Sequence, residues 1–150
     1  MSKNRYKTDE KQNLFVVWDI FVSKKESLFL KNIIEDRKSK YSVTYVKIDS
    51  KEKVKEKFKL ALKYKFYKKA THNTYAYRIL LEDGSILEWK NDDGELWWWN
   101  CILSTMQKEN IVNSMIIVTR YYGWIHLNND RFKHIIDSTK FIIEKLKNDN

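Results

Sequence analysis

The feature that most constrains the fold is a short, continuous apolar run, Met115-Ile116-Ile117-Val118-Thr119. Such a run, without polar alternation, is typical of a strand covered on both faces, so it predicts the centre of a buried sheet. A second strand is predicted from Tyr41 to Val46, where alternate residues are apolar, and it ends at Asp49-Ser50. Leu14 to Phe21, rich in β-branched and aromatic residues, predicts a third strand.

A hairpin and three helices complete the predicted order of elements. Tyr75–Leu81 and Ile86–Lys90 flank an Asp-Gly pair, which favours a tight turn because both residues tolerate positive φ. Apolar residues at helical spacing predict helices over Ser50–Lys69, Glu95–Glu109 and Asn129–Lys147. Asp49 followed by Glu52 resembles a capping box for the first helix, and Asn128 or Asn129 can cap the last one. The order predicts an α+β fold, a mixed sheet with its helices packed on one face.

The 150 residues, 43% of them apolar, are enough for one domain with a substantial core. We expect residues 1–13 to be a disordered tail and residues 14–150 to form a single domain, because no proline and no linker-like stretch marks an internal boundary. The one cysteine, Cys101, cannot form an internal disulfide, and no apolar run reaches the length of a membrane span. These features predict a soluble, cytoplasmic protein.

The charge of the chain is unevenly distributed. The formal net charge is +9, and nine lysines against two glutamates lie between Lys51 and Lys69, so the first predicted helix carries most of it. Concentrated basic charge favours an acidic partner, such as RNA, a ribosome surface or an acidic protein. The alternative is a solvated basic surface without a specific partner, because lysine and asparagine are abundant throughout the chain.

Polar and aromatic residues gather where the predicted strands end. Lysine and arginine neutralise phosphates, and tyrosine can stack on unpaired bases, so this combination predicts nucleic-acid binding. The predicted binding residues are Arg37, Lys38, Lys40, His72, Asn73, Tyr75, Tyr77, Arg78, Asp93, Glu95, Arg120, Tyr121, Arg131 and Lys133. An alternative for Arg78 and Arg120 is a structural ion pair with Asp92, Asp93 or Glu95.

Five segments taken together resemble the Impact (YigZ-like) family. They are Asp36-Arg37-Lys38-Ser39-Lys40, Lys69 to Arg78, Asn91-Asp92-Asp93-Gly94-Glu95, Val118 to Gly123, and Asp130-Arg131-Phe132-Lys133-His134. The resemblance implies a domain of the ribosomal protein S5 domain 2 type and no established catalytic activity. Its eukaryotic members carry an additional RWD domain, which binds an activator of an amino-acid-starvation kinase and so restrains phosphorylation of a translation initiation factor. We expect no RWD domain within these 150 residues.

The resemblance therefore implies a non-enzymatic regulator of translation under stress, without a cofactor or a metal, whose partners are RNA, the ribosome or translation-control proteins. This chain departs from the family pattern at two places. Leu96-Trp97-Trp98-Trp99 and the Trp124 of Tyr121-Tyr122-Gly123-Trp124 stand where small residues are usual, which predicts a filled or reshaped cleft. Two alternatives stay open: a protein-interaction adaptor using the Trp97–Trp99 surface, with Trp97 and Trp98 as contacts, and a hydrolase using His72 with Asp93.

Overall fold

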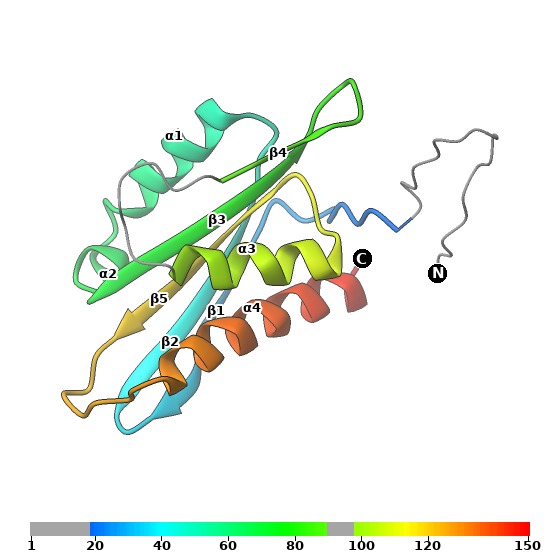
Figure 1. Ribbon diagram of the computed structural model, residues 1–150. Coiled ribbons are helices and arrows are strands. Elements are labelled where there is room, and N and C mark those ends of the chain that lie inside the picture. The colour runs from blue at the N-terminus through cyan, green and yellow to red at the C-terminus, as the bar shows by residue number, and fades with distance from the viewer. Residues whose placement is uncertain (1–18, 90–97) are drawn as a thin grey trace.

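The computed structural model describes residues 19–89 and 98–150 (Figure 1). The elements, in chain order, are β1 (Ser27–Asp36), β2 (Ser39–Lys47), α1 (Lys51–Ala61), α2 (Lys65–Lys68), β3 (His72–Leu80), β4 (Ile86–Glu88), α3 (Trp98–Glu109), β5 (Ser114–Tyr121) and α4 (Asp130–Asn148). The strands form one sheet in the order β1-β2-β5-β3-β4. The predicted α+β class is confirmed. All four neighbouring pairs are antiparallel, however, so the sheet is not mixed as predicted.

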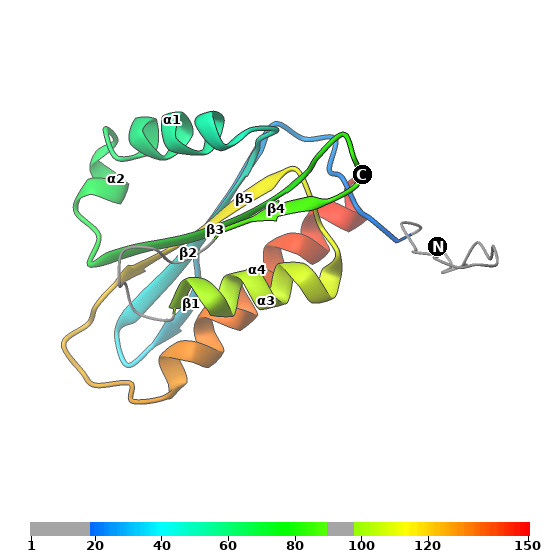
Figure 2. The same ribbon diagram turned by 45° about the horizontal axis from the view of Figure 1, so that its top comes forward.

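Helices cover both faces of this sheet. Successive residues of a strand point to opposite faces. In β5, Ile116 and Val118 join the core beneath α3 and α4, whereas Met115 and Ile117 join a second cluster that contains Val54 of α1. Figure 2 shows α1 and α2 on the side of the sheet away from α3 and α4. The prediction that the helices pack on one face therefore holds for α3 and α4. It is wrong for α1, which packs on the opposite face.

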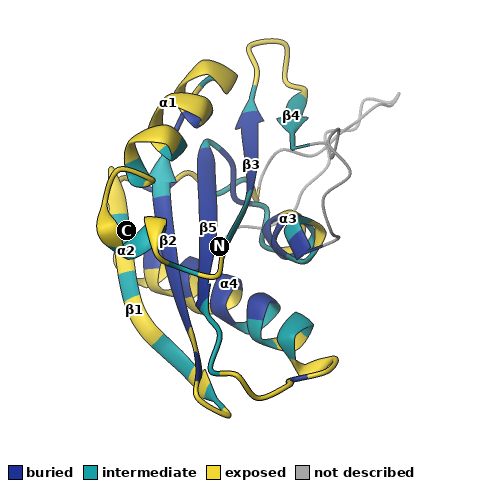
Figure 3. Ribbon diagram, turned by 90° about the vertical axis from the view of Figure 1, so that its left-hand side faces the viewer, coloured by how far each residue is buried: buried dark blue, intermediate teal, exposed yellow. Residues whose placement is uncertain are grey.

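The central strand is buried as the apolar run predicts. Seven of the eight residues of β5 are buried, and Figure 3 shows this strand between β2 and β3 as an almost continuous buried band. The β3–β4 hairpin also forms, with Gly84 at φ +90° in its turn. The predicted strand Leu14–Phe21 lies mostly outside the described residues, although Phe21 forms an isolated parallel bridge with Ile111.

The edge strand β1 has no counterpart among the predicted elements. Its register with β2 shifts between Leu30 and Ile34, and Asn32 there has φ +50°. The backbone N–H of Asn32 donates to Ser42 Oγ at 2.8 Å instead of continuing the ladder. This bulge breaks the alternation by which a strand is recognised in a sequence.

Two of the predicted helices differ from the observed ones, either in extent or in the residue that caps them. The predicted helix over Ser50–Lys69 is divided into α1 and α2. The N-cap of α1 is Ser50, whose side chain accepts from the backbone N–H of Lys53 at 3.2 Å, and not Asp49. The long helix α4 follows Asn129 as predicted, but the Asn129 side chain makes no capping hydrogen bond.

Candidate functional site

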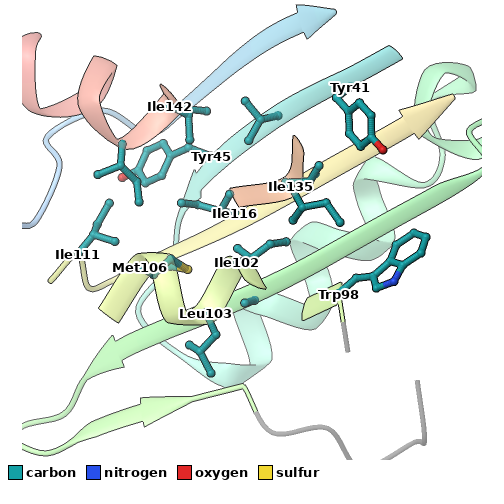
Figure 4. Packing of buried hydrophobic residues seen from close by; sticks show 14 of the residues in the cluster. Tyr41, Tyr45, Trp98, Ile102, Leu103, Met106, Ile111, Ile116, Ile135 and Ile142 are labelled. Carbon is teal, nitrogen blue, oxygen red and sulfur yellow. The ribbon is translucent and has the colours of Figure 1, made fainter. Parts of the chain in front are cut away.

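Two arginines lie against one tryptophan at the end of the sheet where β5 finishes. The Cζ atoms of Arg120, from β5, and Arg131, from α4, are each 5.3 Å from the centroid of the Trp98 ring at the start of described α3. Trp98 is 7% exposed and Arg120 is 9% exposed. Figure 4 shows Trp98 at one end of the hydrophobic core, beyond Ile102. Burial strengthens these cation–π contacts because little water competes with them.

Further rings enclose the two guanidinium groups. The His72 ring meets Trp98 edge-on at 4.8 Å, and Arg120 also lies over the Tyr122 ring at 5.1 Å. His72 is the cross-strand partner of Arg120, so the β3–β5 register fixes both side chains at this end of the sheet. We call this set the Arg–Trp cluster; its members are His72, Trp98, Arg120, Tyr122, Arg131 and Phe132.

The charge of the two arginines is not neutralised within the described part of the chain. Neither Arg120 nor Arg131 forms an ion pair with an acidic side chain there, and the Nε atom of each is buried without a hydrogen-bond partner. Burial raises the pKa of Tyr41, while the adjacent Arg120 guanidinium, through hydrogen bonding and charge, and the charge of Arg131 oppose that rise, so the hydroxyl stays neutral and supplies no counter-charge. Buried donors without partners are costly. The Nη atoms of the two arginines are not among these buried atoms, so an incoming anion would meet the guanidinium groups there.

The turn between β1 and β2 lies beside this cluster and is strained. Asp36 pairs with Ser39, and the two residues between them, Arg37 and Lys38, have φ of +47° and +71°. Two positive φ values define the tight hairpin turn that normally uses asparagine and glycine. Arg37 holds the turn in place because its guanidinium donates to Asp36 at 2.8 and 3.0 Å and pairs with Asp130 at the start of α4.

Asp36 connects this turn to α4 through a second contact. His134 Nε2 is 2.7 Å from Asp36 Oδ2. The Arg37 guanidinium and the His134 ring hold the pKa of the Asp36 carboxyl well below its usual range. The contacts of the ionised carboxylate are therefore favourable in the folded state and lost in the unfolded one.

We expect Asp36→Asn to remove a pH-dependent part of the stability. Because the pKa of Asp36 is lower in the folded state, its contribution is complete above about pH 4, the pKa of an unperturbed aspartate, and is lost as the pH falls further. Urea denaturation of both proteins over a pH series tests this. The wild type should be more stable near neutral pH, and the difference should shrink below about pH 4. A difference that is constant with pH would contradict the assignment.

Known proteins match this chain over the region that contains the Arg–Trp cluster and the β1–β2 turn. The model of the Impact N-terminal domain matches residues 37–143. This chain belongs to the Impact family. The Protein IMPACT homolog of Dictyostelium discoideum is 36% identical over 110 residues, which cover 73% of this chain and 32% of that protein. Protein IMPACT of Homo sapiens is 37% identical over 111 residues, covering 73% and 35%. The chain thus spans about a third of the length of these relatives.

A solved structure confirms the fold of this Impact domain. The crystal structure of a hypothetical protein superposes with a TM-score of 0.66 at 21% sequence identity, over 81% of this chain and 62% of that one. At this level of identity the likeness concerns the fold alone. None of the helices in the described ranges is long and apolar enough to cross a membrane.

Arg78, a predicted binding residue, lies at the other end of β3 from the Arg–Trp cluster. Arg78 pairs with Ser114, whereas His72 pairs with Arg120. The Arg78 guanidinium is buried; its Nε donates to Glu88 at 2.9 Å and its Nη1 to the carbonyl oxygen of Ile111 at 3.2 Å. These contacts favour the structural alternative for Arg78, although its partner is Glu88 and not one of the residues between 92 and 95.

Four other predicted binding residues also make contacts within the fold. Asn73 donates to the carbonyl oxygen of Tyr67 and accepts from Thr119 Oγ1, each at 2.8 Å. Tyr75 and Tyr77 belong to the cluster on the α1 face, away from Trp98. Tyr121 is half-buried, and its hydroxyl donates to the carbonyl oxygen of Phe66.

The remaining predicted cations lie on the surface, and some predicted positions are not described. Lys38, Lys40 and Lys133 are exposed, and Lys133 pairs with Asp137 at 2.8 Å. Asp93, Glu95 and Trp97 lie outside the described residues. Of the two predicted adaptor contacts, Trp98 is buried against the two arginines, and Trp97 is the one that is not described. Phe132 stands in one of the five matching segments, but its helical spacing is that of an ordinary core residue and does not indicate a place in the cluster.

The chemistry that the cluster offers is anion binding. Burial raises the pKa of the Cys101 thiol, which makes it a poor nucleophile near neutral pH. Within residues 19–89 and 98–150, no group of three or more histidine, cysteine, aspartate or glutamate side chains could hold a metal ion. Two guanidinium groups with spare donors instead match the geometry of a phosphate or carboxylate.

Proposed function

We propose that this Impact domain is a non-catalytic RNA-binding module of translation control, acting in the cytoplasm. The observation that carries the proposal is the pair Arg120 and Arg131, stacked on Trp98 with buried Nε donors and no acidic partner among the described residues. RNA presents phosphates to such donors. Membership of the Impact family supports the link to translation, and the RNA contact is proposed from the geometry of the cluster.

The lysine-rich segment joins the cluster through the backbone. All nine lysines between Lys51 and Lys69 are exposed. Immediately after them, the N–H of Thr71 donates to the carbonyl oxygen of Arg120, and Thr71 Oγ1 accepts from the N–H of Tyr122, both at 2.9 Å. The end of α2 is therefore held beside the cluster. These lysines would attract RNA over a distance, and the two arginines would hold individual phosphates.

Replacing both Arg120 and Arg131 with alanine is expected to weaken the binding of a short, labelled single-stranded RNA by about tenfold or more. A lost hydrogen bond to a charged group is worth about 1.5 kcal/mol or more, which corresponds to that factor. Fluorescence anisotropy measures the affinity. The ionic strength should be about physiological, because a lower salt concentration would exaggerate the contribution of the exposed lysines.

The matched control is the double variant Lys108→Ala/Lys140→Ala, which removes the same charge from exposed positions. Lys108 lies in the last turn of α3, at the opposite end of that helix from Trp98. We expect the control to bind nearly as well as the wild type. Equal losses in the two double variants would show that the attraction is diffuse, and absence of binding by the wild type would refute the proposed function.

A further inference from the structure

Trp124 is the most exposed of the large hydrophobic residues described. Its side chain is 86% exposed, and the neighbouring Ile125 is 43% exposed. The backbone of Trp124 has φ +68°, a conformation that bulky side chains rarely adopt. An exposed tryptophan on a strained backbone persists only where the surrounding structure imposes it, and such positions gather at functional sites.

The loop that carries Trp124 is firmly held on both sides. Before it, the N–H of Gly123 donates to Ser39 Oγ at 2.9 Å, and a Cβ atom on Gly123 would lie 2.2 Å from the carbonyl carbon of Lys38. After it, Arg37 Nη1 donates to the carbonyl oxygen of His126 at 3.4 Å, and Leu127 is buried. The exposure of Trp124 is therefore a fixed feature of the loop.

Trp124 is the outermost member of a continuous series of aromatic and guanidinium groups in contact. Its ring centroid is 5.2 Å from that of Tyr122. Tyr122 in turn lies 5.1 Å from the Cζ atom of Arg120, which is 5.3 Å from the Trp98 ring. The series runs from an exposed aromatic ring to a buried guanidinium group with a spare donor. A nucleotide has the same two parts, a flat base and a charged phosphate, joined by a short linker.

We propose that Trp124 stacks on an unpaired base of the RNA whose phosphate Arg120 and Arg131 hold. This inference rests on the proposed function and deepens it, because it makes single-stranded RNA the preferred ligand. Bases inside a duplex are already stacked on their neighbours and do not offer a free face to a side chain. Exposed cations beside the loop, on Lys38 and Lys40, match the charge of a strand that continues past the stacked base.

The test compares three ligands of equal length: a single-stranded RNA, the same strand without its bases, and a duplex. Wild-type protein should bind the single strand about tenfold more tightly than the abasic strand, because stacking on one aromatic residue contributes that much. Trp124→Ala should weaken binding of the single strand by a similar factor and leave the affinity for the abasic strand unchanged. Trp124→Tyr, which keeps an aromatic ring, should restore most of the affinity.

The possible outcomes separate this inference from the proposed function. If the wild type binds no RNA, both fall. Base stacking is refuted if the wild type binds all three ligands equally, or if Trp124→Ala binds the single strand as tightly as the wild type does. In either case the proposed function stands, and the exposed Trp124 ring is then available for a contact with another protein. If Trp124→Ala does not fold, equal binding of the three ligands by the wild type still refutes base stacking, and Trp124→Tyr still tests the ring.

Discussion

Replacing Arg78 with methionine is expected to lower the free energy of unfolding by about 3 kcal/mol. The guanidinium is buried, pairs with Glu88 at 2.9 Å and donates to the carbonyl oxygen of Ile111 at 3.2 Å. Methionine fills a similar volume but leaves the carbonyl oxygens of Ile111 and Met106 without this donor, and the Glu88 carboxylate keeps only the Gln107 amide. Glu88 is only half-buried, so the loss comes from the buried carbonyl oxygens left unpaired as well as from the carboxylate charge that stays behind. Urea denaturation monitored by circular dichroism measures the loss.

The double variant Arg78→Met/Glu88→Leu is the matched control for this prediction. Removing both charges should recover much of the stability, because a buried pair replaced by apolar groups is often neutral. The folded fraction of Arg78→Met should also bind single-stranded RNA with nearly the wild-type affinity, since Arg78 is about 20 Å along β3 from His72. If Arg78→Met lowered the affinity for RNA without lowering the free energy of unfolding, Arg78 would be a binding residue and its structural role would be contradicted.

Gly123→Ala is expected to destabilise the protein by about 3 kcal/mol and to weaken RNA binding at the same time. The added Cβ atom would lie 2.2 Å from the carbonyl carbon and 2.3 Å from the carbonyl oxygen of Lys38. Both are backbone atoms of a tight turn, so they cannot rotate away as a flexible side chain would. The loop must therefore move away from the turn, and it carries Tyr122 and Trp124 with it.

Gly84→Ala distinguishes this contact from the general cost of losing a glycine. Gly84 has φ +90°, but no atom lies within 4 Å of the position of a new Cβ atom, and the β3–β4 turn is far along the chain from the cluster. We expect a loss of about 1 kcal/mol and unchanged RNA binding. Thermal melting and anisotropy on both variants provide the comparison. Equal effects of the two substitutions would contradict the role of the Gly123–Lys38 contact.

The sequence predicted the elements whose hydrophobic pattern is uninterrupted. The apolar run of β5, the Asp-Gly hairpin and the helical spacing of α4 each appear in the structure close to their predicted positions. The edge strand β1 escaped prediction because the bulge around Asn32 interrupts its alternation. The position of α1 could not be deduced, since β5 is apolar on both faces and either face could accept a helix.

His72, Trp98, Arg120 and Arg131 of the cluster are among the residues singled out in the sequence, but their arrangement could not be deduced from it. Arg120 and Arg131 were identified from their charge and their motifs, yet Arg78 was grouped with them although strand geometry separates it from His72. Tryptophan is equally hydrophobic at every position, so the sequence could not show that Trp98 is buried and Trp124 exposed. The turn at Arg37-Lys38 was missed as a turn because it lacks glycine and asparagine, and ion pairs stabilise it instead.

The most direct test of the RNA-binding site is the salt dependence of affinity for single-stranded RNA, measured on the wild type and on Arg120→Ala/Arg131→Ala. The slope of the logarithm of affinity against the logarithm of salt concentration reports how many phosphates are neutralised, at about 0.7 for each. If each arginine holds one phosphate, the slope of the double variant should be shallower by about 1.4. Identical slopes for the two proteins would contradict the account and assign all the attraction to the exposed lysines.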